Sequence, residues 1–361
     1  MSEKYKSLWI SLFSIVWLAC TLNAIYHYLG AGRDDVFITL WAGKTLGTAP
    51  WFINYNGELQ EISSSILGAL IARFAYLCCS DNYYLVNKLL GGGVALATLW
   101  IIWHNRYTFF RISPAGSAIA TIALLGFNSS FAYWSLSGLE TPYYTLLILL
   151  HSVLVIQIFH LQKHDIPQRT YYYLAIVQAL AILCRPEGFW LLGITLTLLL
   201  AYWPNLVDRR VHILKISLLP PVLFLLLLLA IRQTLTGAIF PNPVYAKVSL
   251  SYLGNIQEGW EYLSKFHGLG LIGALLAASS VGAGVIVCYA MYHRLLWARR
   301  SRTQLASRLL APALSICAYD AFIIFVKGDW MEYHRFLVPT LSLKMLLLFM
   351  AGERLHAAVS N

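Results

Sequence analysis

Charged side chains are scarce in this sequence. They make up 12% of the 361 residues, about half of the ~25% that is usual in soluble domains. Hydrophobic residues make up 59%, which is more than a water-covered surface can carry. The composition therefore excludes an ordinary soluble protein and predicts a polytopic membrane protein.

Acidic residues are scarcer than basic ones, 16 against 26, which gives a formal net charge of +10. In a soluble protein this excess would suggest binding to nucleic acid. In a membrane protein, basic residues gather in the cytoplasmic loops. The charge is therefore explained without nucleic acid as a partner.

Ordered cysteine patterns are also lacking. The six cysteines are scattered, mostly inside apolar runs, and no CxxC or Cys/His cluster occurs. We expect them to be small core hydrophobes, and no metal site is predicted from them. No internal repeat, low-complexity tract or soluble domain is evident. We therefore expect residues 1–361 to form a single transmembrane domain.

Long apolar runs, in contrast, are abundant. Ten runs of about 17–25 residues are candidate spans. They are residues 8–29, 84–103, 116–133, 141–160, 171–186, 188–203, 213–231, 268–292, 309–326 and 336–351. The first run has no small-residue cleavage site after it, so it predicts an uncleaved helix rather than a signal peptide.

An eleventh run, residues 62–80, begins with three serines and contains Arg73. With ten spans the basic connections all fall on one side, which makes that side cytoplasmic. With eleven, the strongest basic loops would lie opposite the basic N-terminus. We therefore expect ten spans, both termini in the cytoplasm, and 62–80 as an interfacial or re-entrant helix.

This topology places most carboxylates on the outer side, where the longest loops are residues 30–83 and 232–267. The acidic residues on or near that side are Asp34, Asp35, Glu58, Glu61, Asp81, Glu140, Glu187, Glu258, Glu261, Asp329 and Glu332. Ionised groups beside lipid are costly. Their gathering on one face indicates a functional site there.

Asp34 and Asp35 follow the first apolar run directly. Residues 36–46 have helical spacing, and Gly47 stands where a helix commonly ends, so we expect a short interfacial helix capped by Asp34 or Asp35. Neighbouring helix residues project about 100° apart, so one carboxylate can cap while the other faces a cavity. Capping together with a pairing to Arg33 is the purely structural alternative.

Two further segments break the apolar runs. In residues 134–142, Glu140 precedes a helix start marked by Pro142, and a capping role alone is the structural alternative. In residues 184–188, Arg185 and Glu187 lie between two apolar runs with too few residues for an exposed loop. We expect each of them to pair, with the other or with a third group, and a structural ion pair at a helix break is the alternative.

In residues 239–247, prolines on both sides of Asn242 stiffen an outer loop that presents Tyr245 and Lys247. A rigid loop with a solvated lysine is the structural alternative.

Residues 327–339 hold Asp329, Trp330 and Arg335 between the last two spans. An arginine at an outer helix N-terminus is unfavourable for topology and for the helix dipole. Its placement suits a bidentate grip on a phosphate.

Five segments resemble, in their residues and in their order, segments of bacterial GT-C membrane glycosyltransferases. They are residues 32–38, 137–142, 185–188, 241–247 and 328–339. The sequence is most similar to the branch that holds the mycobacterial terminal arabinofuranosyltransferase and the pilin-modifying arabinosyltransferases. The resemblance covers nearly the whole chain. It implies an all-α membrane protein, a GT-C-like bundle of about ten transmembrane helices, with interfacial helices in the first outer loop.

The resemblance also implies an activity. Such an enzyme takes a sugar from a polyprenyl-phosphate donor and passes it, with inversion, to a hydroxyl of a glycan, glycolipid or protein. It works at the outer face of the bacterial cytoplasmic membrane. The branch favours a pentofuranose such as arabinofuranose, and a hexose such as mannose or glucose remains open. The family's catalytic aspartate in the first outer loop corresponds to Asp34 or Asp35.

The remaining roles follow from inverting transfer, which needs a base on the acceptor and help for the leaving phosphate. We assign the cations in the order Arg335, Lys247, Arg185. The other residues assigned to substrate binding or orientation are Tyr245, Asn242, Glu140, Glu187, Asp329 and Trp330. A divalent cation could bind at Asp34, Asp35 and Asp329, although no ligand spacing requires one.

The sequence departs from the family at two points. Many relatives carry an extra outer domain after the last spans, and none follows here before Asn361, so we expect a partner or a small or lipid-linked acceptor. The stretch around Glu61 also differs from the family pattern. Two other functions stay open: a transporter or flippase of lipid-linked sugars, favoured by Asp320 inside the ninth span, and a non-catalytic assembly subunit.

Overall fold

The computed structural model describes residues 3–30, 32–159, 166–247, 252–268, 270–296 and 304–359. Within these residues the chain is all-helical, with 81% helix and no strand. The expected all-α class is therefore confirmed.

The α-helices are α1 (Glu3–Tyr28), α2 (Asp35–Thr45), α3 (Ile66–Cys78), α4 (Tyr83–His104), α5 (Arg106–Phe109), α6 (Pro114–Gly126), α7 (Ser129–Ser135), α8 (Thr141–Phe159), α9 (Gln168–Cys184), α10 (Trp190–Tyr202), α11 (Arg210–His212), α12 (Leu219–Thr236), α13 (Asn242–Lys247), α14 (Tyr252–His267), α15 (Gly270–Leu296), α16 (Gln304–Phe325) and α17 (Val338–Val359). Short 3₁₀ or π segments are η1 (Pro186–Phe189), η2 (Trp203–Asn205), η3 (Ile213–Leu218) and η4 (Glu332–Leu337).

Several helices are long and apolar enough to cross a membrane. Among the described residues there are seven: Ser7–Tyr28, Tyr83–His104, Thr141–Phe159, Arg210–Thr236, Gly270–Tyr292, Arg308–Phe325 and Glu332–Ala357. The pair α6 and α7, bent by 70°, makes an eighth if it is one broken span. Helices α9 and α10 have 17 and 13 residues, about 26 and 20 Å, which is short of the ~30 Å hydrocarbon layer. A multi-pass membrane protein follows, and the count of ten spans stays a prediction.

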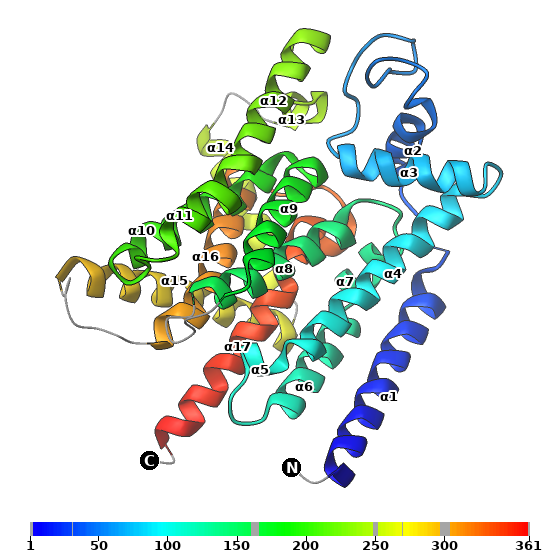
Figure 1. The fold of residues 1–361 in the computed structure, drawn as a ribbon. Helices are drawn as coiled ribbons and strands as arrows, with labels where there is room; N and C mark the ends of the chain where they lie inside the picture. Colours follow the sequence, from blue (N-terminus) through cyan, green and yellow to red (C-terminus); the bar gives the residue numbers. More distant parts are fainter. Residues whose placement is uncertain are drawn as a thin grey trace.

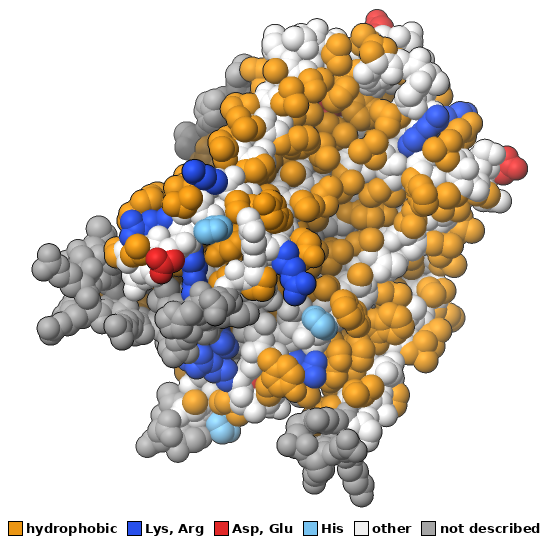
Figure 2. Space-filling view, viewed as in Figure 1, with side chains coloured by type: hydrophobic (Ala, Val, Ile, Leu, Met, Phe, Trp, Pro, Cys, Tyr) orange, Lys and Arg blue, Asp and Glu red, His pale blue; other side chains and the backbone are white. Residues whose placement is uncertain are grey.

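The helices form a bundle with distinct ends. Helix α1 begins and α17 ends at the same end of the bundle, and α2 and α3 lie at the opposite end (Figure 1). Helix α1 runs along the edge of the bundle in that view. Hydrophobic side chains cover much of the surface in Figure 2, as expected for helices that meet lipid. Which end faces the cytoplasm stays a prediction.

The first outer segment contains the two expected helices, α2 and α3. Gly47 follows α2 with φ +91°, and Ser65 caps α3 by accepting a hydrogen bond from the Gly68 amide at 2.9 Å. The two helices approach closely at Gly43, where a Cβ would lie 2.6 Å from Ala72 Cβ. A larger residue at Gly43 would push α3 away. The place of both helices at a membrane interface stays a prediction.

The second expected outer loop, residues 232–267, is largely helical. It contains the end of α12, then α13 and α14. The prolines that suggested a stiff loop stand at the start of α13, where a missing amide donor costs nothing. Helix α14 packs on α16 at Gly259, where a Cβ would lie 2.4 Å from the Ile324 carbonyl oxygen. The segment is therefore a structured cover rather than a loop.

Candidate active site

Asp34 caps α2 at the end of the bundle away from the chain termini. Its Oδ1 accepts a hydrogen bond from the Asp35 amide at 3.0 Å, and its side chain is exposed. Asp35 is the first residue of α2 and is half-buried. The two carboxylates therefore differ in environment, as the helical geometry predicts, and Asp34 is the more accessible.

Arg33 joins this stretch to the last outer segment. Its guanidinium forms an ion pair with Glu332 of η4, whose side chain is 71% exposed. Desolvation acts to lower the pKa of Arg33, but Tyr133 and Glu332 outweigh it and raise that pKa, so the group stays charged. The structural alternative expected Arg33 to pair with Asp34 or Asp35, and the ion pair that the structure shows is with Glu332 instead.

The second segment packs directly against the first. Gly138, with φ +82°, lies against α2, and a Cβ there would come 2.9 Å from Val36 Cγ2. The Asn87 side-chain amide donates to the Gly138 carbonyl at 2.6 Å and fixes the turn. Only glycine combines this backbone angle with this approach. The turn therefore packs closely against the first turn of α2.

Arg185 lies at the centre of a closed, buried cluster. Its Nη1 donates to Glu140 at 3.0 Å and its Nε to Glu187 at 2.5 Å, and all three side chains are about 5% exposed. The guanidinium also stacks over the Phe336 ring, 4.7 Å from its centroid. Tyr319 donates to Glu187 at 3.5 Å. One cation facing two carboxylates holds three of the five segments together.

Arg335 is arranged differently. Its Nε donates to Asp329 Oδ2 at 2.8 Å, and the guanidinium lies 5.8 Å from the Trp134 ring centroid. Within the described part of the chain, its two terminal nitrogens form no hydrogen bond with protein. The Arg335 side chain is 7% exposed and that of Asp329 is fully buried, so the guanidinium lies in almost closed surroundings. Trp330, one residue after Asp329, is 69% exposed.

The backbone around Arg335 is held in an unusual shape. Tyr333 and His334 have φ angles of +54° and +47°, which non-glycine residues adopt only when their surroundings require it. The Trp134 indole donates to the Tyr333 carbonyl at 3.1 Å, and the Phe336 amide donates to the Tyr262 hydroxyl at 3.3 Å. Burial, and then Asp329, raise the pKa of Tyr262. Strain of this kind is common at functional sites.

The fourth segment meets the first outer segment. The Asn242 amide donates to the Glu61 carbonyl at 3.1 Å, and the Glu61 carboxylate binds Arg232 through two bonds of 2.8 and 2.7 Å. The Tyr245 hydroxyl accepts from the Phe240 amide at 3.3 Å, and its ring is exposed. The side chain of Lys247 lies outside the described residues.

Sequence reasoning missed the Glu61–Arg232 pair. The available signal was Arg232 itself, a cation at the end of an apolar run that the predicted topology places outside, where a basic residue is as unfavourable as Arg335. It also missed Lys344, whose ammonium binds Asp320 at 2.9 Å between α17 and α16. This pair neutralises the carboxylate inside the bundle.

Across the described residues, no group of three or more His, Cys, Asp or Glu side chains is arranged to hold a metal ion. The divalent cation considered for Asp34, Asp35 and Asp329 has no assembled site there.

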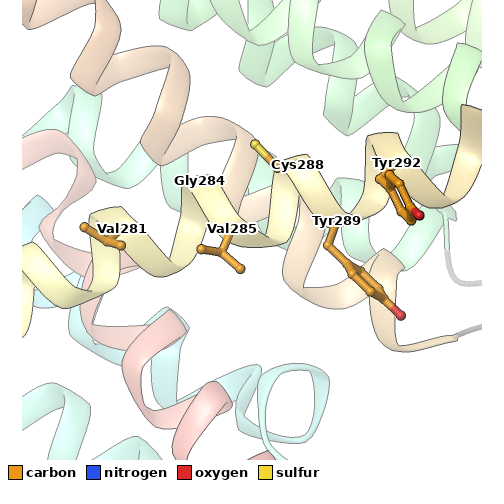
Figure 3. A pocket seen from close by; sticks show the side chains of 6 residues that line it. All are labelled: Val281, Gly284, Val285, Cys288, Tyr289 and Tyr292. Atoms are coloured by element: carbon orange, nitrogen blue, oxygen red, sulfur yellow. The ribbon is translucent and has the colours of Figure 1, made fainter.

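A shallow hollow on the described surface lies elsewhere. It is formed by Val281, Gly284, Val285, Cys288, Tyr289 and Tyr292, all from α15 (Figure 3). A hollow on one helix, lined almost wholly by apolar atoms, fits a lipid-facing surface. None of the predicted site residues lines it.

Comparisons with known proteins add no relative. A scan against protein-family models found no match, and searches of curated proteins and of solved structures found none. The case for a function therefore rests on the residues and their contacts.

Proposed function

We propose that this chain is an inverting, GT-C-like glycosyltransferase. It moves a sugar, with a pentofuranose such as arabinofuranose favoured, from a polyprenyl-phosphate donor to an acceptor hydroxyl. The reaction takes place at the outer face of a bacterial cytoplasmic membrane. Transfer of mannose or glucose by the same fold is the closest variant.

One observation carries the proposal. Four of the five segments, which lie far apart in the sequence, contact one another, and the fifth, residues 241–247, contacts the connection between α2 and α3. The contacts are Arg33 with Glu332, Val36 with Gly138, Arg185 with Glu140 and Phe336, and Asn242 with Glu61. Helix caps without a shared function would not need these contacts with the segment that carries the exposed carboxylate of Asp34.

The chemistry follows from this placement. Asp34 takes the proton of the acceptor hydroxyl, and the oxygen attacks the anomeric carbon on the face opposite the phosphate. The bond from that carbon to the phosphate oxygen breaks, and its electron pair leaves with the lipid phosphate. The anomeric configuration is therefore inverted. A phosphate is a good leaving group, so cations suffice and a general acid is not required.

The structure sharpens the choice among cations. Arg335 offers two donors in a planar fork, which suits a phosphate. Arg185 faces two carboxylates in a buried cluster. We therefore assign Arg185, Glu140 and Glu187 a structural role, in which their ion pairs hold three segments of the fold together. Lys247 remains the second proposed cation. Asn242, Tyr245 and Trp330 remain proposed substrate contacts. Asp329 orients Arg335.

The second candidate, a transporter or flippase of lipid-linked sugars, is favoured by the buried pair of Asp320 and Lys344. Intramembrane charges of this kind often mark a translocation pathway. This candidate predicts movement of labelled lipid across vesicles that hold the protein, without any sugar transfer.

The test supplies membranes that contain the chain with polyprenyl-phosphate arabinofuranose, mannose or glucose, and follows the glycan products by mass spectrometry. We expect transfer of one sugar above the level of membranes without the chain. Loss of one cell-surface glycan when the gene is deleted would identify the acceptor. Absence of transfer with all three donors, combined with lipid movement, would favour the flippase.

A further inference from the structure

Three arginines gather at the end of the bundle where α1 begins and α17 ends, opposite the proposed active site (Figure 1). Arg111 precedes α6, Arg308 lies in the second turn of α16, and Arg354 lies near the end of α17. The Arg308 guanidinium is close enough to those of Arg111 and Arg354 for their charges to act on it, and Arg111 also acts on Arg354. Segments that are distant in sequence therefore bring three like charges together, and we call this group the arginine cluster.

Glu353 is the carboxylate next to the arginine cluster, and it is bound by other groups. It accepts hydrogen bonds from the backbone amides of residues 111–113 at 2.8, 3.3 and 3.0 Å and from the Ser117 hydroxyl at 3.0 Å. Within the described part of the chain, no ion pair joins Arg111 or Arg354 to Glu353 or to any other carboxylate. Their charges are therefore not neutralised by the protein there.

The arginine cluster lies at the level where membrane spans end. One candidate span begins at Arg308, and another, Glu332–Ala357, ends three residues after Arg354. Arg111 lies three residues before Pro114, the first residue of α6. Three residues of helix correspond to about 4.5 Å. The three guanidinium groups therefore stand at the border between the hydrocarbon layer and the lipid headgroups.

The surroundings of the arginine cluster suit a lipid. Arg111 is exposed, and Arg308 and Arg354 are half-buried. Charges that are partly buried are screened less by salt than fully exposed ones. Ile112 and Leu355, which follow two of the arginines in the sequence, are exposed apolar side chains. A headgroup can therefore reach the cations from outside while its acyl chains meet apolar surface.

We propose that Arg111, Arg308 and Arg354 form a binding site for the phosphate of an anionic phospholipid. Guanidinium groups bind phosphate oxygens through paired, charge-assisted hydrogen bonds, and basic pockets between membrane-spanning helices bind anionic headgroups. The bound phosphate offsets the repulsion among the arginines and ties α6, α16 and α17 together. The site lies at the other end of the bundle from Asp34 and does not depend on the proposed function.

The test measures lipid binding to the purified full chain by native mass spectrometry, with phosphatidylglycerol as the anionic lipid and phosphatidylcholine as the neutral one. We expect Arg111→Gln and Arg354→Gln each to weaken phosphatidylglycerol binding about fivefold, and the double variant about 25-fold, because each arginine contributes separately to the attraction. Binding of phosphatidylcholine should not change in any of these variants. Thermal unfolding reports whether each variant folds.

Two further variants separate the site from a general effect of charge. Helix α9 ends at the Arg185 cluster, so the exposed Arg169 in its first turn lies toward the same end of the bundle as the arginine cluster. Arg169→Gln removes the same charge outside the arginine cluster and should leave binding unchanged. Glu353→Gln removes the neighbouring negative charge and should tighten phosphatidylglycerol binding several-fold. A role of Glu353 in capping alone predicts lower stability without this gain.

Several outcomes would overturn the proposal. Equal binding of the two lipids would exclude a site for anionic lipid, and equal weakening by Arg169→Gln and Arg354→Gln would exclude the arginine cluster as its location. Inorganic phosphate that raises the unfolding temperature as much as phosphatidylglycerol does, with the same dependence on Arg354, would assign the site to free phosphate. Loss of a bound acidic protein instead of a lipid in the arginine variants would assign it to a protein partner.

Discussion

The Arg185 cluster and the Asp34 stretch are both charged groups at the same end of the bundle, yet their surroundings are opposite. In the cluster, one guanidinium is enclosed by two carboxylates and by aromatic rings, almost without solvent. In the Asp34 stretch the carboxylate is exposed, and the partner of the neighbouring Arg33 is 71% exposed. The contrast suggests that the buried charges stabilise the fold and that the accessible charges take part in catalysis.

The two regions should therefore respond differently to substitution. Removing one member of a buried pair leaves an uncompensated charge and costs about 3–5 kcal/mol. Breaking an exposed pair costs about 0–1 kcal/mol. The first kind of change should lower stability, and the second should alter activity without unfolding the protein.

The largest effect on stability is expected for Arg185→Met. It leaves Glu140 and Glu187 buried without a cation, so we expect the free energy of unfolding to fall by about 3–5 kcal/mol. Thermal and denaturant unfolding in detergent measure this change. The triple variant Glu140→Gln, Arg185→Met, Glu187→Gln removes all three charges and should recover much of the loss. An unchanged unfolding midpoint in Arg185→Met would contradict the stabilising role of Arg185.

A second buried pair allows the same comparison at a distance from the cluster. Glu61→Gln removes the charge that binds Arg232 through two hydrogen bonds, and we expect a loss at the lower end of the range for a buried pair, about 3 kcal/mol. Hydrogen exchange should rise in residues 46–65, because the pair ties this segment to α12. Exchange that rises evenly over the whole chain would argue against a local tie.

Gly138→Ala tests the contact between the turn that precedes Glu140 of the Arg185 cluster and the start of α2. The added Cβ meets Val36 and the residue must keep φ +82°, so we expect a loss of about 1–3 kcal/mol. Because Gly138 packs against the first turn of α2, which carries Asp34 and Asp35, sugar transfer should fall more than stability alone explains. Gly352→Ala, at a position with nothing within 4 Å of its Cβ, is the control and should leave transfer unchanged.

The smallest effect is expected for Glu332→Gln. It breaks the exposed pair with Arg33, so stability should change by no more than about 1 kcal/mol. Any change should shrink as salt is added, because exposed pairs are screened. A large loss of stability that is independent of salt would show that this pair stabilises the fold in the way the buried Arg185 cluster does.

Short-range signals explain what the sequence could predict of this fold. Helix α2 is capped by Asp34 and ends before Gly47, and the break after Cys184 carries the expected pairing of Arg185 with Glu187. Caps, glycines and prolines act within a few residues, so they are visible in one sequence. The class of the fold follows in the same way from the apolar runs.

Partners that are distant in sequence could not be predicted. Glu140 lies 45 residues from Arg185, and Glu61 lies 171 residues from Arg232. Such pairs depend on how the helices pack, which hydropathy does not determine. The helical content of residues 232–267 was missed for a related reason: α14 is held in place by its close packing on α16 at Gly259.

The most direct test of the central claim, that the exposed carboxylate at the start of α2 is the catalytic base, is sugar transfer by Asp34→Asn in vesicles with a lipid-linked donor. We predict a loss in kcat of about 10²–10⁴-fold, with an unfolding midpoint equal to that of the wild type, because Asn also caps a helix. Asp35→Asn, measured beside it, should lose less. Transfer at the wild-type rate in both variants would contradict the account.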